Sequence, residues 1–186
     1  PDVAKANRPH ASICPPDCPF HSACYVNWAF SPPSVQLHHS GKPVWTPRAI
    51  REIATGRAVR LGAEGDPSAV PIRVWHNLLS GCQSWTGYTH AWRDGRNRFY
   101  REICMASVES PADAAFAVEL GWRPYRVRPR ESVLMANEID CLSSRGVLCA
   151  NCGLCKGAHA TAPMISIEAH GGAVAGRESN RIAVGV

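Results

Sequence analysis

The chain has 186 residues, of which 45% are hydrophobic, and its formal net charge is +5. This length supports one domain with a full hydrophobic core, which argues against a small scaffold held together by disulfides. No apolar run approaches the ~20 residues that cross a bilayer, so we expect a cytoplasmic protein with no membrane partner.

The first 47 residues are rich in Pro, Ser, His and Cys and show no sustained periodicity, so a loop-built region is predicted. It contains Cys14, Cys18 and Cys24 in a C-x3-C-x5-C spacing. Thiolates this close in sequence can turn toward one centre, and soft sulfur ligands select zinc or iron–sulfur clusters. His38 and His39 follow in the same region, and solvent exposure is favoured for them over a role as a fourth ligand.

Alternating helix and strand signals fill the middle of the chain. Thr46-Pro47 begins a helix, because proline suits the first turn, and Gly56 ends it. The following signals predict a strand at 58–62, a helix at 71–79, a β segment at 84–90, a strand at 102–108, a helix at 110–121, and strands at 123–127 and 164–168. We therefore expect an α/β fold: a partial (β/α) barrel or an open, mostly parallel sheet, with cysteine-rich metal-binding loops at both ends. Residues 1–170 would form this single domain and residues 171–186 a flexible tail.

A second cysteine group lies between the last two predicted strands, within residues 141–157. Its members are Cys141, Cys149, Cys152 and Cys155, spaced C-x7-C-x2-C-x2-C. Four thiolates can close a tetrahedral zinc site or hold a [4Fe–4S] cluster, and the spacing does not choose between them. One member could instead join the three N-terminal cysteines. A disulfide framework fits less well, because nine cysteines would leave one thiol unpaired.

Polar residues gather where the predicted strands end, which in parallel α/β folds is the edge that holds the site. Asp66 follows the first strand and His90 the next, and we predict both as catalytic candidates. His90 is placed to act as a general base, a substrate ligand or a metal ligand, or to be a hydrogen-bonded structural residue. His170 has the same ambiguity. For Glu64 and Asp66 the structural alternative is a Gly-Asp-Pro turn with ordinary solvated carboxylates.

A cysteine cluster before the first strand, followed by a strand and a Gly/Glu-rich turn, resembles the N-terminal half of a radical S-adenosylmethionine (SAM) enzyme. The resemblance implies a [4Fe–4S] cluster on the three N-terminal cysteines, with one iron open to SAM. It also implies that Gly62, Glu64, Gly65 and Asp66 form the turn that binds SAM. The spacing departs from the usual C-x3-C-x2-C of that superfamily.

The chain looks closer still to a small, often bacteriophage-encoded family of uncharacterised proteins. The shared stretches are CPPDCP at 14–19, GDP at 65–67, TGYTHAW at 86–92, C-x2-C-x-L-C at 149–155 and AHG at 169–171.

These features give several hypotheses. The first is an iron–sulfur protein, possibly a radical SAM-like enzyme, with one or two [4Fe–4S] clusters, an unidentified electron donor, and a nucleotide, nucleic acid or peptide as substrate. The second is a zinc-stabilised module that binds nucleic acid or protein, with arginines in 93–101 and 123–130 contacting phosphates. A solvated face is favoured over this role for the two stretches. A metal-dependent hydrolase that uses Glu64, Asp66 and His90 is the third.

Overall fold

The computed structural model describes residues 13–19, 37–38, 40–42, 44–158 and 162–169. Its strands lie in two sheets, of order β1-β2 and β3-β4-β5-β7-β6, and every strand pairing in them is parallel. The strands are β1 (Ala58–Arg60), β2 (Ser84–Thr86), β3 (Tyr88–Thr89), β4 (Met105–Val108), β5 (Pro124–Arg128), β6 (Glu138–Asp140) and β7 (Met164–Glu168). The predicted α/β class with an open parallel sheet is confirmed.

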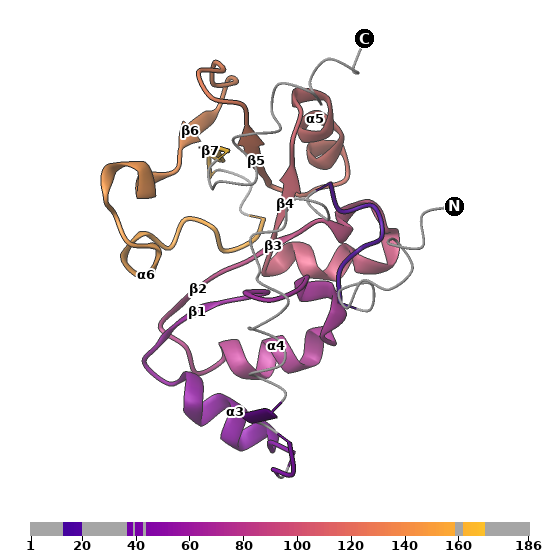
Figure 1. Cartoon of the computed structure of the whole chain (residues 1–186), viewed down its shortest axis with the longest axis vertical. Helices are drawn as coiled ribbons and strands as arrows, with labels where there is room; N and C mark the ends of the chain where they lie inside the picture. The colour runs from indigo at the N-terminus through magenta and orange to yellow at the C-terminus, as the bar shows by residue number, and fades with distance from the viewer. Residues whose placement is uncertain (1–12, 20–36, 39, 43, 159–161, 170–186) are drawn as a thin grey trace.

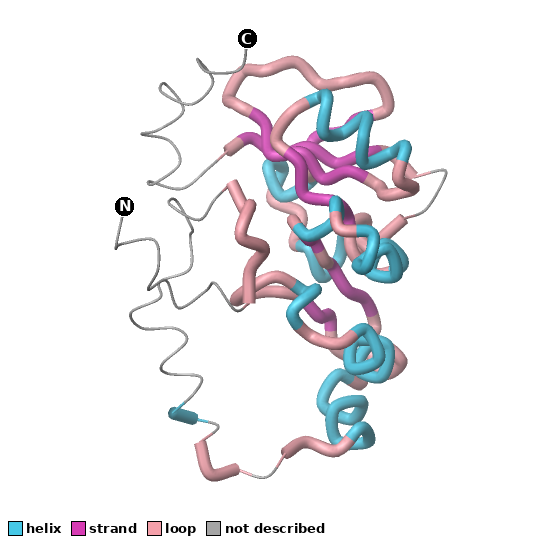
Figure 2. Tube along the Cα trace, turned by 90° about the vertical axis from the view of Figure 1, so that its right-hand side faces the viewer, coloured by secondary structure: helices cyan, strands magenta, loops and turns pink. Residues whose placement is uncertain are grey.

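The longer helices begin at the caps that the sequence predicts. Thr46 and Ser110 accept hydrogen bonds from the backbone N–H groups three residues further on, and a proline follows each cap. The α-helices are α3 (Pro47–Ala54), α4 (Ile72–Leu79), α5 (Pro111–Glu119) and α6 (Cys149–Cys152). The 3-10 helices are η2 (Pro67–Ala69), η3 (Ala91–Arg93), η4 (Gly95–Glu102) and η5 (Leu142–Arg145). Figure 2 shows most helices gathered along one side of the strands.

The two sheets are joined at Gly87, which separates β2 from β3. Its carbonyl accepts a hydrogen bond from Met105 N at 2.9 Å, and its own N–H donates to Cys155 O at 3.1 Å. A Cβ atom at this position would lie 2.9 Å from Cys104 Sγ and 3.0 Å from Leu61 Cδ1. Glycine therefore allows the chain to pass from one sheet into the other through a crowded point.

The two faces of the larger sheet are covered differently. Ala106 and Val108 of β4 share one hydrophobic cluster with Ala114 and Ala117 of α5. Met105 points to the opposite face, because side chains alternate along a strand. There it forms a second cluster with the buried residues Ile165 and Cys155. The helix α5 thus covers one face, and the segment containing the second cysteine group covers the other.

Two expectations for this part of the chain were wrong. The strand predicted from residue 102 begins only at Met105, because Gly95–Glu102 forms η4. The short strand β6 was not predicted, and β7 lies between it and β5. None of the helices in the described part of the chain is long and apolar enough to cross a membrane.

Candidate functional site

The segment with Cys14 and Cys18 lies against the turn that follows β1. Asp66 N donates a hydrogen bond to Ile13 O at 2.7 Å, and Cys18 N donates to Pro15 O at 3.1 Å. A Cβ atom on Gly65, whose φ is +98°, would approach Ile13 Cδ1 to 3.0 Å. Cys14 and Cys18 are both partly exposed. The third predicted ligand, Cys24, lies outside the described residues.

The predicted cofactor turn is a tight structural turn. Gly62 has a φ of +66°, and a Cβ atom there would lie 2.6 Å from Pro67 Cδ. Glu64 is exposed, whereas Asp66 is buried. The carboxylate of Asp66 accepts hydrogen bonds from Ser68 N at 2.9 Å, Thr89 Oγ1 at 2.7 Å and His90 N at 2.8 Å. Asp66 therefore caps η2 and connects the turn after β1 to the end of β3. Its carboxylate is buried, whereas the structural alternative expected a solvated one.

His90 lies between a carboxylate and a thiol. Its Nε2 atom is 3.4 Å from Glu109 Oε1, which follows β4. Burial acts to lower the pKa of His90, but hydrogen bonds with Cys18 and Glu109 outweigh it and raise this pKa to about 10. The carboxyl ends of β3 and β4 thus bring His90, Glu109 and Cys18 together. The position of His90 at this edge follows from the sequence, whereas its contact with Glu109 depends on the register of β3 and β4.

The second cysteine group surrounds a pair of tyrosines on the face opposite α5. The rings of Tyr88 and Tyr125 are 4.2 Å apart between centroids. Tyr88 is hydrogen-bonded to the Cys155 thiol and Tyr125 to the Cys141 thiol. Burial first, and then these thiols, raise the pKa of both tyrosines well above the usual range. Burial also raises the pKa of Cys155 to about 11.

The remaining two members of this group lie at the ends of α6. Cys149 is exposed and lines a cavity of about 400 Å³ together with Tyr88, Tyr125 and Cys141. Cys152 is half-buried and interacts electrostatically with Cys155. The structure therefore places all four predicted ligands around one region of the sheet.

The buried Arg123 fixes this segment to the amino end of β5. Its Nη1 donates to Gly157 O at 3.0 Å and its Nη2 donates to Leu154 O. Gly157 has a φ of +89°, and a Cβ atom there would overlap the carbonyl of Glu102. Arg123 and the close approach at Gly157 therefore hold the segment that carries Cys155.

The donor chemistry of both groups fits a metal centre, although the described side chains do not form a closed ligand set. No cysteine in the described ranges forms a disulfide, so their thiols stay available as soft ligands. Within residues 13–19, 37–38, 40–42, 44–158 and 162–169, no three His, Cys, Asp or Glu side chains lie close enough to hold one metal ion. These side chains would have to move closer together to bind a metal ion. At the N-terminal group Cys24, which lies outside the described residues, would also have to join them.

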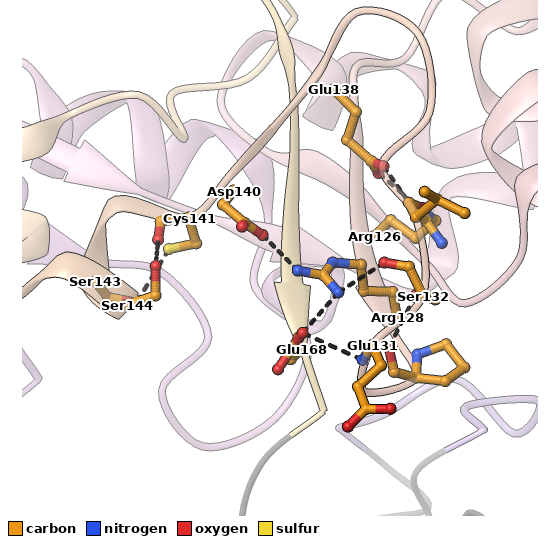
Figure 3. Close-up of polar contacts among 12 residues, drawn as sticks. Arg126, Arg128, Glu131, Ser132, Glu138, Asp140, Cys141, Ser143, Ser144 and Glu168 are labelled. Carbon is orange, nitrogen blue, oxygen red and sulfur yellow. Dashed lines mark hydrogen bonds and ion pairs between the residues drawn. The ribbon is translucent and has the colours of Figure 1, made fainter.

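A cavity of about 420 Å³ lies at the carboxyl ends of β5, β6 and β7. Figure 3 shows the Arg128 guanidinium between two carboxylates from neighbouring strands. Its Nη1 donates to Glu168 Oε1 at 2.8 Å and its Nη2 to Asp140 Oδ1 at 2.6 Å. Cys141, Ser143 and Ser144 also line this cavity. This cavity lies at the edge of the sheet where parallel α/β folds bind ligands.

Three of the four arginines in 123–130 are internal, which corrects their assignment to a surface that contacts phosphates, whereas Arg130 is exposed. Arg123, Arg126 and Arg128 are at most 5% exposed. Arg126 forms a buried ion pair with Glu138, at 2.6 Å between Nη2 and Oε2. Alternation along β5 points Arg126 and Arg128 to the same face, but the sequence of this strand does not show that this face is the buried one.

Four further residues with donor side chains are either placed by the structure or lie outside the described ranges. Cys104 is fully buried, and burial raises its pKa. His38 is exposed and lies 3.0 Å from Lys42 Nζ through its Nε2 atom. His39 and His170 lie outside the described residues. Comparisons with protein-family models, curated proteins and solved structures found no match to the chain.

Proposed function

We propose that this protein binds an iron–sulfur cluster through Cys14, Cys18 and Cys24 at the carboxyl edge of its parallel sheet. The observation that carries the proposal is the 2.7 Å hydrogen bond from Asp66 N to Ile13 O, next to Cys14. It attaches the first cysteine segment to the edge at which parallel α/β folds bind their ligands. A second centre would be held by Cys141, Cys149, Cys152 and Cys155.

The described residues would support the first centre by holding its cysteine segment in place. Asp66 uses its carboxylate to hold the backbone of His90 and uses its N–H to hold the cysteine segment. The imidazole of His90 interacts with both Cys18 and Glu109. When bound, a cluster would supply one-electron redox chemistry.

A radical SAM-like enzyme is the narrower form of this proposal. It needs one iron without a protein ligand, and it assigns SAM binding to the turn with Gly62, Glu64 and Gly65. In this turn the Asp66 carboxylate accepts hydrogen bonds from three donors, and the side chain of Glu64 is exposed. Formation of 5′-deoxyadenosine from SAM under reducing conditions would test this form.

The test of the broader proposal is metal analysis without air exposure. We expect brown protein with visible cluster absorption and with iron and sulfide in the ratio of [4Fe–4S] clusters. Cys14→Ser and Cys18→Ser should remove one cluster, Cys149→Ser together with Cys152→Ser should remove the other, and Cys82→Ser should remove neither. Colourless protein with stoichiometric zinc would overturn the proposal and favour the zinc-stabilised binding module.

A further inference from the structure

The arginine stretch at 93–101 lies on the surface, unlike the arginines of β5. Most of it forms η4, a 3-10 helix, in which side chains three positions apart lie above one another in three rows. One row faces inward: Tyr100 is buried and its hydroxyl donates to Val70 O at 2.7 Å, and Asn97 Nδ2 donates to Ala91 O at 3.0 Å. The other two rows contain exposed side chains, among them Arg96, Arg98, Phe99 and Arg101.

Two of these arginines have no carboxylate partner in the described part of the chain. Arg96 is paired with Asp94, at 2.6 Å between Nη2 and Oδ2. Arg98 and Arg101 form no ion pair with a described residue. Their guanidinium groups each donate to a backbone carbonyl at 3.5 Å, which is a long and therefore weak hydrogen bond. Both cations are therefore able to bind an anionic ligand.

Phe99 adds an aromatic surface beside these two cations. Its side chain is 50% exposed, and Cζ of Arg98 lies over the ring at 4.3 Å from the centroid. Arg98 and Arg101 are one turn apart, which is about 6 Å along the axis of a 3-10 helix. A cation and an exposed ring side by side are the groups with which proteins bind single-stranded nucleic acid, because phosphates contact the cations and bases stack on the ring.

We propose that the exposed side of η4 binds single-stranded nucleic acid, with one base stacked on Phe99 and with phosphates on Arg98 and Arg101. A duplex would bind less tightly, because its bases are stacked on one another and do not reach the ring. An acidic peptide would use the two cations alone, so the exposed ring favours a ligand that carries bases. This inference goes beyond the proposed metal centres and does not depend on them.

Fluorescence anisotropy of a labelled oligothymidine with the full-length protein tests the role of the arginines. The logarithm of the binding constant should fall with the logarithm of the salt concentration, with a slope of about −1.4 for two phosphates of a single strand. Arg98→Met and Arg101→Met should each reduce this slope by about half. Arg145→Met is the matched control and should leave it unchanged, because Arg145 is exposed in a different 3-10 helix, η5.

The stacking role of Phe99 predicts a separate effect. Phe99→Leu should weaken binding of the oligothymidine by about 5- to 150-fold, which corresponds to the loss of one stacked base. On an abasic strand with the same phosphates, Phe99→Leu should have no effect, whereas Arg98→Met should still weaken binding. Thermal unfolding checks that the variants fold, since both side chains are exposed.

Three results would overturn this inference. The first is that the oligothymidine does not bind at low salt. The second is binding that Arg98→Met and Arg101→Met leave unchanged, since the strand would then lie elsewhere on the protein. The third is that polyglutamate or heparin competes as well as the oligothymidine does and Phe99→Leu has no effect, which would indicate an acidic partner. None of these results affects the iron–sulfur proposal, which depends on the iron and sulfide content.

Discussion

The two cysteine-bearing segments are attached to the sheet in different ways. The segment with Cys14 and Cys18 lies at the carboxyl edge, where Asp66 N donates to Ile13 O, and both thiols are partly exposed. The segment with Cys155 packs across one face of the sheet, where this cysteine is buried and Arg123 donates to two of its carbonyls. One group is therefore part of a hydrophobic cluster, and the other lies beside the edge where a ligand can approach.

This difference separates a buried segment from one at an accessible edge of the sheet. Removal of the contacts around Arg123 should lower the stability of the domain, because those contacts are buried. Removal of the contacts around Asp66 should chiefly affect the first cysteine segment and His90. The four predictions below test this difference, from the largest expected effect to the smallest.

Arg123→Met should lower the free energy of unfolding by about 3 kcal/mol or more, because each buried carbonyl left without a donor costs about 1–3 kcal/mol. Urea denaturation measures this change. The same variant should lose metal from the second cysteine group before the first. Arg98→Met is the control, since Arg98 is exposed, and a surface change of this kind stays within about 0.5 kcal/mol. Equal effects of the two variants would contradict an anchoring role for Arg123.

Gly157→Ala should destabilise the protein by about 2–3 kcal/mol, because the new Cβ atom meets the Glu102 carbonyl and the φ of +89° disfavours any side chain. Gly146→Ala is a matched control. Gly146 has a similar φ of +79°, but nothing lies within 4 Å of its Cβ position. The control should show only the backbone cost of about 1–2 kcal/mol. Thermal unfolding of both variants isolates the contribution of the contact with Glu102.

Asp66→Asn should cost about 1–2 kcal/mol, because the amide replaces one acceptor oxygen by a donor that faces N–H and O–H groups. We expect faster hydrogen exchange in the first cysteine segment and at His90, with little change around Arg123. Asp17→Asn, at an exposed position, should change neither. Faster exchange in the second cysteine segment would contradict the separation of the two regions.

Low pH should weaken the ion pair that connects β5 to β6, the strand that precedes Cys141. Burial acts to raise the pKa of Glu138, but hydrogen bonds from Arg126 and from Met135 N outweigh it and lower this pKa below the usual value. The ion pair therefore contributes stability that is fully present above the pKa of the unfolded state, near 4.5, and is lost as the pH falls through the lower folded value. The expected loss of stability is the smallest of the four, because only one carboxylate takes up a proton. Urea denaturation between pH 6 and pH 3 should show it, and Glu138→Gln should reduce the pH dependence in that range.

The helices and most strands could be predicted because their signals are local. Thr46 and Ser110 cap helices through bonds to residues only three positions away. The strand β6 could not be predicted, because three residues carry too little periodicity and its pairing with β7 depends on residues 26 positions away.

The site could be predicted in position but not in its contacts. Asp66 and His90 follow predicted strands, which placed them at one edge of a parallel sheet. That Asp66 binds backbone groups of a neighbouring strand depends on the register of the sheet, which the sequence alone does not determine. The arginines of β5 looked like a charged surface, because their partners Glu138, Asp140 and Glu168 come from strands later in the chain.

The position of β7 also determines the order in which the protein can be completed during synthesis. This strand is the last of those described in the chain, yet it lies between β5 and β6 and contains the buried Ile165 and Ser166. On the ribosome, Glu138–Asp140 and all four cysteines of the second group emerge before the strand that connects them to the domain. Until residues 164–168 leave the exit tunnel, β6 has no neighbour to pair with, and the nascent chain must carry these thiols on an unfinished sheet.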